Sequence, residues 1–122
     1  MDWNFRNDQP IYSQLTQRLT EAIVSGIYAP GEKLPSVREL AVEAGVNPNT
    51  VQRALSELER DGLVFSQRTA GRFVTENENM IANAKLRIAD ELVGEFLHSM
   101  KTLVCTRDEV IALIRGAKEE EE

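Results

Sequence analysis

Several features that define common protein classes are scarce in this 122-residue sequence. Its one cysteine, Cys105, excludes an internal disulfide and is typical of proteins from a reducing compartment. No run of about 18 apolar residues occurs, so the sequence predicts no membrane-spanning helix. The N-terminus lacks the basic and apolar regions of a signal peptide. We therefore expect a soluble, cytoplasmic protein.

Metal ligands and catalytic groups are equally scarce. His98 and Cys105 have no second histidine and no Cys-x-x-Cys pair beside them, whereas a zinc site needs three or four such ligands. The sequence also contains no recognisable nucleophile–base pair and no phosphate-binding glycine loop. We therefore expect no enzyme, no metal site and no cofactor.

Basic charge is in deficit, because 14 Lys and Arg stand against 20 Asp and Glu, a net charge of −6. The deficit is uneven. Residues 1–75 carry 8 basic and 9 acidic side chains, whereas residues 76–122 carry 6 and 11. The acidic excess therefore lies mainly in the C-terminal part. The nearly neutral N-terminal part can bind DNA if its basic residues share one face.

Two helix start signals lie close together in the stretch LPSVRELAVEAGVNPNTVQRA. Ser36 and Glu39 have the spacing of a capping box, and Gly45 is typical of the residue that ends a helix. Asn47 then predicts an N-cap, with Pro48 in the first helical position. Two helices joined by a short turn are typical of a helix-turn-helix, whose second helix usually enters the major groove of DNA.

Apolar periodicity and turn residues predict the elements around this motif. These are an N-terminal extension at 1–9, helices at 10–25, 48–61, 80–100 and after Thr106, strands at 63–65 and 72–75 with a hairpin turn between them, and a polar hinge at 76–79. The expected fold class is therefore mainly α with a small β wing. A winged helix-turn-helix DNA-binding domain at 1–75 is followed by a short two-helix dimerisation tail at 76–122.

The spaced motifs resemble those of the GntR family of winged-helix transcription factors. The matching segments are PIYSQL from position 10, GIY and PG from 26, LPSVRELA from 34, VNPNTV from 46, LERDGL from 58 and GRFV from 71. The NPNTV segment and the short tail resemble the YtrA subfamily, which implies a repressor acting on a transporter operon. The family's wing carries Gly-x-Gly before the aromatic residue. This sequence has Thr69 at the first position, which alters the wing only if that position needs a positive φ.

Arg38 is the first DNA-binding candidate. The resemblance implies that an arginine at this position contacts phosphate or a base edge. A guanidinium beside a helix N-terminus, opposite Leu40 and Ala41, also has a free fork for phosphate or guanine. The alternative is a surface salt bridge with Glu39 or Glu43.

Five further candidates lie at the start of the recognition helix: Asn47, Asn49, Thr50, Gln52 and Arg53. Asn49 and Thr50 can reach base edges or phosphates beside the free N–H groups of the helix start. Gln52 has the amide that binds adenine in a bidentate manner. For the two asparagines the alternative is helix capping alone.

The predicted wing supplies four more candidates: Arg68, Thr69, Gly71 and Arg72. A basic hairpin tip suits a neighbouring minor groove or the DNA backbone. The alternative for Arg72 is a solvated charge on an exposed strand.

The helix expected at 80–100 carries more apolar surface than a lone helix can bury. We expect it to pair with the same stripe of a second subunit, since two-fold dimers are the commonest oligomers. The predicted interface residues are Ile81, Ile88, Leu92, Phe96 and Leu113. The alternative is packing back onto the winged helix. The tail is too short for a roomy effector pocket, so any small-molecule control would use the dimer interface or the hinge.

These patterns predict a homodimeric, sequence-specific DNA-binding transcriptional regulator. We expect a repressor that binds an inverted-repeat operator, and the resemblance points to a transporter operon. The alternative is a winged-helix protein-interaction module that does not bind DNA.

Overall fold

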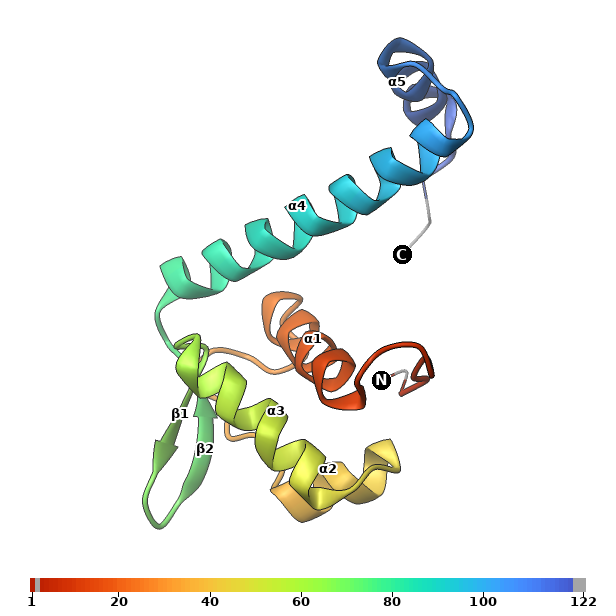
Figure 1. Cartoon of the computed structure of the whole chain (residues 1–122). Coiled ribbons are helices and arrows are strands. Elements are labelled where there is room, and N and C mark those ends of the chain that lie inside the picture. Colours follow the sequence, from red (N-terminus) through yellow and green to blue (C-terminus); the bar gives the residue numbers. More distant parts are fainter. Residues whose placement is uncertain (2, 120–122) are drawn as a thin grey trace. The chain divides into compact units, whose positions relative to one another are not determined.

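A computed structural model describes residues 1 and 3–119, and the chain divides into two compact units, Met1–Leu86 and Arg87–Glu122. The elements follow in the order α1 (Ile11–Val24), α2 (Val37–Ala44), α3 (Pro48–Arg60), β1 (Val64–Gln67), β2 (Gly71–Val74), α4 (Glu78–Thr102) and α5 (Arg107–Gly116) (Figure 1). The unit boundary falls within α4. No helix in the described part of the chain combines the length and apolarity that crossing a membrane requires.

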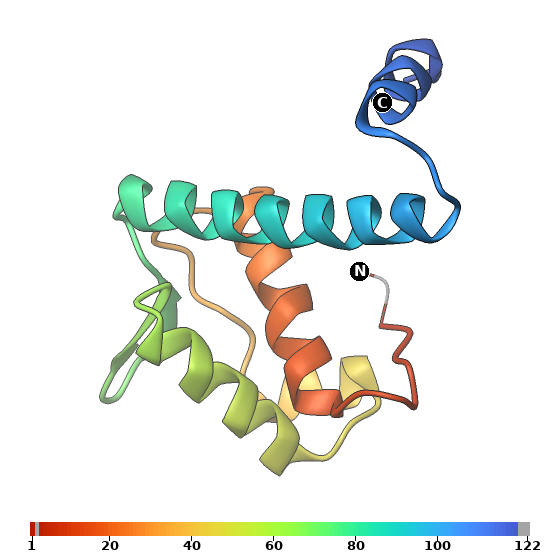
Figure 2. The ribbon, with the colours of Figure 1, turned by 45° about the horizontal axis from the view of Figure 1, so that its top comes forward.

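The core of the first unit is formed by three helices, with α1 and α2 both packed against α3 (Figure 2). Leu15 and Leu19 of α1, Leu40 of α2 and Leu58 of α3 are completely shielded from solvent. Their sequence spacing places them on single helix faces, as the apolar periodicity predicts. Burying each leucine contributes about 1.5–3 kcal/mol, so this cluster fixes the helix-turn-helix in place.

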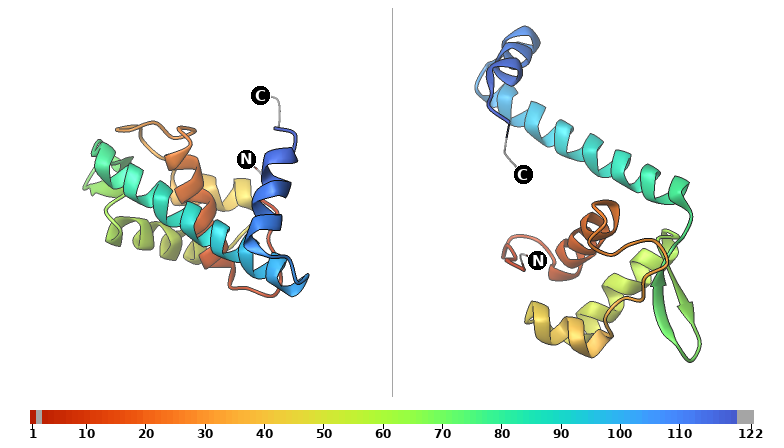
Figure 3. Two further views of the ribbon diagram at one scale, coloured as in Figure 1. Left: turned by 90° about the horizontal axis from the view of Figure 1, so that it is seen from above. Right: turned by 180° about the vertical axis from the view of Figure 1, so that it is seen from behind.

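A two-stranded antiparallel hairpin follows α3 and forms the wing (Figure 1). Its strands lie at positions slightly different from those predicted, because Leu63 closes the end of α3 by donating its N–H to Leu58 O, 3.0 Å away. Pairing begins at Val64, whose partner is Val74. The segment before α2 runs along the outer edge of β2, where Leu34 N donates to Arg72 O at 2.9 Å (Figure 3).

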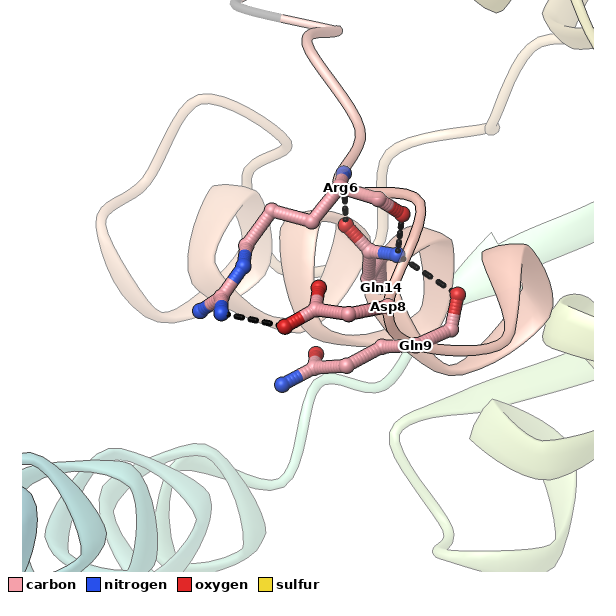
Figure 4. Close-up of polar contacts among 4 residues, drawn as sticks. All are labelled: Arg6, Asp8, Gln9 and Gln14. Atoms are coloured by element: carbon pink, nitrogen blue, oxygen red, sulfur yellow. Dashed lines mark hydrogen bonds and ion pairs between the residues drawn. The ribbon is translucent and has the colours of Figure 1, made fainter.

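The N-terminal extension packs against the helices of the first unit, to which it belongs. The partly buried side chains of Trp3 and Phe5 pack against the hydrophobic core. Trp3 Nε1 donates to Glu43 Oε1 of α2 at 3.1 Å. Gln14 of α1 accepts from Arg6 N at 2.7 Å and donates back to Arg6 O at 2.8 Å (Figure 4). The extension is therefore tied to both α1 and α2.

The first turns of α4 belong to the winged-helix unit. Asn77 Oδ1 accepts from Asn79 N at 3.0 Å, so this cap starts the helix two residues before the predicted position. Ala84 is buried in the core cluster and Ile81 packs against it. A Cβ atom on Gly62 would overlap Met80 Cε, so the methionine side chain lies directly over that turn. The beginning of the apolar stripe thus packs within its own chain.

The second unit contains the rest of α4 and the whole of α5. Thr106 and Glu109 form a capping box at the start of α5, the helix that the sequence predicts after Thr106. The hydrogen bonds from Thr106, backbone first, lower the pKa of the Glu109 carboxyl. Val110 is buried, whereas several large apolar side chains of this unit remain exposed. The boundary that the sequence analysis places between a DNA-binding domain at 1–75 and a dimerisation tail at 76–122 stays a prediction.

Candidate nucleic-acid interface

The start of α2 is capped as the sequence predicts. Ser36 Oγ accepts from Glu39 N, Glu39 Oε1 accepts from Ser36 N, and both distances are 3.1 Å. These bonds, the backbone one first, lower the pKa of the Glu39 carboxyl. Because Glu43 accepts from Trp3, both proposed salt-bridge partners of Arg38 are otherwise engaged. Arg38 is exposed and forms no ion pair within the described residues.

The N-terminus of α3 presents backbone donors and short polar side chains. Asn47 Oδ1 accepts from Asn49 N at 2.7 Å, and Pro48 occupies the first turn, which contains no acidic residue. The capping role offered as the alternative for Asn47 is therefore present, and its DNA contact stays a prediction. Asn49 and Gln52 are exposed and Thr50 is half-buried. This end of the helix is open to an anionic ligand such as phosphate.

Arg53 lies on the side of α3 that faces the start of α1. Its guanidinium carbon is 3.6 Å from the centroid of the Tyr12 ring. This cation–π contact leaves the charge of Arg53 intact while restricting the side chain. Sequence reasoning missed this contact, because Tyr12 and Arg53 lie 41 positions apart on two different helices.

The wing tip carries an exposed arginine on a narrow turn. Arg68 and Thr69 are both exposed. Among residues of described backbone, Val104 is the only non-glycine with a positive φ, so Thr69 does not need the glycine that the family usually has there. Gly71 does need to be glycine, since its φ is +110°.

A hollow of about 360 Å³ separates the wing tip from the start of α2. Its lining comes from Lys33, Leu34, Pro35, Ser36, Val37, Glu39, Thr69, Ala70, Gly71 and Arg72. The structure therefore brings three of the four wing candidates, Thr69, Gly71 and Arg72, beside the N-terminus of α2. Lys33 was missed from the sequence because it was assigned to a turn. The bridge that places it opposite Phe73 depends on long-range pairing that no local pattern encodes.

Arg72 is half-buried and its guanidinium is already engaged. Arg72 Nε donates to Glu59 Oε1 of α3 at 2.6 Å. Ser66 Oγ donates to the same oxygen, also at 2.6 Å. The hydrogen bonds of Ser66 and then Arg72 lower the pKa of the Glu59 carboxyl. The DNA contact assigned to Arg72 stays a prediction, since its guanidinium holds α3 and the wing together.

The predicted dimer-interface residues fall into two groups. Ile81 packs against the core of the first unit, and Ile88 is half-buried. Leu92, Phe96 and Leu113 have exposed fractions of 50%, 42% and 56%. These three residues offer an apolar surface available to a partner. No cluster of three metal-ligating side chains occurs among the residues that the structure describes.

Comparisons with known proteins agree with this geometry. Residues 11–74 match the family model described as bacterial regulatory proteins, gntR family. The uncharacterized HTH-type transcriptional regulator YhcF of Bacillus subtilis is 38% identical over 94% of this chain and 95% of its own. The HTH-type transcriptional repressor YtrA of the same organism is 40% identical over 75% of this chain and 72% of its own.

Solved structures share the same architecture. A GntR family transcriptional regulator from Listeria monocytogenes superposes with a TM-score of 0.86 at 36% identity, covering 93% of this chain and 100% of the other. The DNA-binding domain of AraR in complex with operator ORX1 matches with a TM-score of 0.53 at 31% identity, covering 55% of this chain and 81% of the other. The second match is therefore a winged helix that has been seen on its operator.

Proposed function

This chain belongs to the GntR family of bacterial regulatory proteins, and from that membership we propose that it is a homodimeric repressor that binds an inverted-repeat operator. The family comprises DNA-binding transcriptional regulators and not enzymes, so operator binding is the activity to explain. The similarity to a repressor named YtrA supports repression. A transporter operon, cytoplasmic action and the YtrA-like subdivision form part of the same proposal.

The observation that carries the proposal is a set of polar side chains left available at two helix starts and a wing tip. Arg38, Gln52 and Arg68 are exposed, and neither arginine forms an ion pair within the described residues. They lie on α2, on α3 and in the turn between β1 and β2. We assign Gln52 to base edges in the major groove, and Arg38 and Arg68 to phosphates or groove edges. Asn49, Thr50 and Thr69 complete the proposed contact surface.

The exposed apolar face of the second unit supports dimerisation. Leu92, Val93 and Phe96 follow one another on α4, and Leu113 and Ile114 add exposed surface from α5. Exposed large apolar side chains that gather on neighbouring helices often mark an interface. A two-fold dimer would present two recognition helices to two half-sites one helical turn apart. We propose that a signal altering the relation of the two winged helices would release the DNA.

The decisive experiment measures binding to DNA and its salt dependence. A selection from random DNA should yield an inverted repeat, and the full chain should retard a fragment that contains it. Affinity for this fragment should fall steeply between about 50 and 200 mM salt, because bound cations are released from the phosphates. Failure to select any sequence, or an affinity unaffected by salt, would favour a protein-interaction module instead.

A further inference from the structure

Glu59 lies where the recognition helix meets both strands of the wing. Its Oε1 accepts from Ser66 Oγ of β1 and from Arg72 Nε of β2, both at 2.6 Å. Ser66 and Arg72 are direct cross-strand partners in the hairpin register. One carboxylate oxygen therefore joins α3 to both strands at the same position along the hairpin.

The Glu59 contact lies directly beyond the last buried apolar pair of the wing. Val64 and Val74 form the first cross-strand pair and are both buried. Because side chains alternate along a strand, the next pair on that face is Ser66 with Arg72. Beyond this pair lie only Gln67, Gly71 and the turn. Glu59 thus makes the outermost side-chain hydrogen bonds from α3 to the hairpin among the described residues.

A wing of two short strands needs such support. Isolated two-stranded hairpins are marginally stable in water, and this one has four residues in each strand. The edge of β2 is held by backbone bonds from the segment before α2, among them Leu34 N to Arg72 O at 2.9 Å. Those bonds hold β2 alone, whereas Glu59 contacts both strands.

The contact between the Glu59 carboxylate and the Arg72 guanidinium is a strong polar interaction. The side chains of Arg72 and Glu59 have exposed fractions of only 21% and 32%. Hydrogen bonds from Ser66 and Arg72 lower the pKa of Glu59, so the carboxylate is ionised at neutral pH. A charged acceptor with a charged donor forms a shorter and stronger hydrogen bond than a neutral pair.

We propose that Glu59 and Arg72 are positioning residues for operator binding, which fix the wing relative to α3 so that Arg68 meets the DNA while α3 lies in its groove. The inference deepens the proposed operator binding and rests on it. Arg72 acts through Glu59 and the wing and not through its own contact with phosphate. Glu59, although negatively charged, strengthens binding to a polyanion.

Removing the negative charge of Glu59 should therefore weaken operator binding, whereas removing an ordinary surface carboxylate should not. Glu59→Gln preserves the size of the side chain and removes its charge, and it should weaken operator binding about tenfold by loosening the wing. Glu57→Gln is the matched control, because it removes the same charge two positions earlier, where the partner is Arg60 of the same helix at 3.2 Å. Glu57→Gln should bind at least as tightly as the unsubstituted chain. Fluorescence anisotropy with the selected operator measures all three affinities.

A second arm separates positioning from direct contact. In an Arg68→Ala background the wing tip has lost its charge, so adding Glu59→Gln should change affinity less than about twofold. Arg72→Lys keeps the charge but lacks the Nε donor, and it should weaken binding as much as Glu59→Gln. Ser66→Ala removes one bond without altering charge and should weaken binding less, again only while Arg68 is present. Circular dichroism checks that each variant is folded. If Glu59→Gln does not fold, the comparison of Ser66→Ala with and without Arg68 tests the proposal instead.

Three results would overturn the inference while leaving the proposed function intact. Glu59→Gln could bind as tightly as Glu57→Gln, Arg72→Lys could retain full affinity, or the losses of Glu59→Gln and Arg68→Ala could simply add. Absence of operator binding by the unsubstituted chain would overturn the proposed function, and the inference with it.

Discussion

The guanidinium of Arg53 lies over the ring of Tyr12, with 3.6 Å between the guanidinium carbon and the ring centroid. The contact joins the recognition helix to the start of α1. It is outside the buried core, since Arg53 is exposed and Tyr12 is half-buried. A side chain held in this way keeps its charge and loses part of its freedom, which favours a repeatable contact with a phosphate.

The ring of Tyr12 is therefore expected to matter more than its hydroxyl. Tyr12→Leu should weaken operator binding and lower the unfolding free energy by about 0.5–1 kcal/mol, the usual value of an exposed cation–π contact. Tyr12→Phe retains the ring and should behave nearly as the unsubstituted chain. Anisotropy titration and urea unfolding measure the two quantities. Equal operator affinity for the two variants would show that the ring does not position Arg53 for DNA.

Arg38 should contribute directly to DNA binding. Because it has no ion-pair partner within the described residues, Arg38→Ala leaves the fold intact and should cost about 1–3 kcal/mol of operator affinity. Arg18→Ala is a suitable control, since Arg18 pairs with Glu21 on α1 at 3.9 Å. Competition with unrelated DNA distinguishes the two types of contact. A uniform loss across sequences indicates a phosphate contact, and a loss confined to the operator indicates a base contact.

Two glycines should respond in opposite ways to alanine. Gly71 has φ +110°, and an added Cβ would lie 3.0 Å from Lys33 Cε. The end of the Lys33 side chain can move away, but the backbone at position 71 must keep its positive φ. Gly71→Ala should therefore lower the unfolding free energy by about 1–3 kcal/mol. Gly94 is inside α4 with nothing within 4 Å of an added Cβ, so Gly94→Ala should stabilise it by about 0.5–1 kcal/mol. Thermal unfolding compares both variants; destabilisation by Gly94→Ala would indicate a close neighbour in the dimer.

Local signals in the sequence predicted most of the fold. Ser36, Asn47 and Thr106 each cap the helix that their spacing predicts, because capping depends on residues only two or three positions away. The apolar stripe of α1 is buried for the same local reason. The packing of the beginning of α4 was less well predicted. The helical spacing of Ile81 and Ala84 fits equally a face buried within the chain and a face buried against a second subunit.

The candidate site was predictable where it consists of exposed residues on a motif, and less so where side chains contact one another. The bonds from Glu59 to Ser66 and Arg72 require both the helix phase and the hairpin register. The sequence predicted the strand bounds to within one or two residues but gave no pairing register, and the register decides which side chains of the two strands share a face. The role of Glu59 could therefore only come from the structure.

Charging the exposed face of α4 should disrupt the proposed dimer. Leu92 has an exposed fraction of 50%, so Leu92→Glu should leave the fold intact while placing a charge in the interface. Ile27→Glu is the control, because Ile27 is 58% exposed and lies outside the tail. Sedimentation velocity should show monomers for the first variant and dimers for the second. A dimeric Leu92→Glu would mean that subunits meet on another surface.

Acid should weaken the contribution of Glu59 to stability. Its pKa is lowered in the folded state, chiefly by Ser66, so the stabilisation is complete above the ordinary carboxyl value near 4.5 and is lost as pH falls through the lowered value. At neutral pH the unfolding free energy of Glu59→Gln should be lower than that of the unsubstituted chain by up to about 1 kcal/mol. Urea unfolding from pH 7 to pH 3 should show this difference shrink. A difference independent of pH would mean that ionisation of Glu59 has no part in it.

The hydrogen bond between Trp3 and Glu43 also provides a natural optical probe. The chain contains one tryptophan, and its indole is half-buried between the N-terminal extension and α2. Its emission therefore comes from a single environment, beside α2, the first helix of the helix-turn-helix. A spectral shift on adding operator would report a rearrangement at α2 without any attached label, and an unchanged spectrum would indicate that this region binds as a preformed surface.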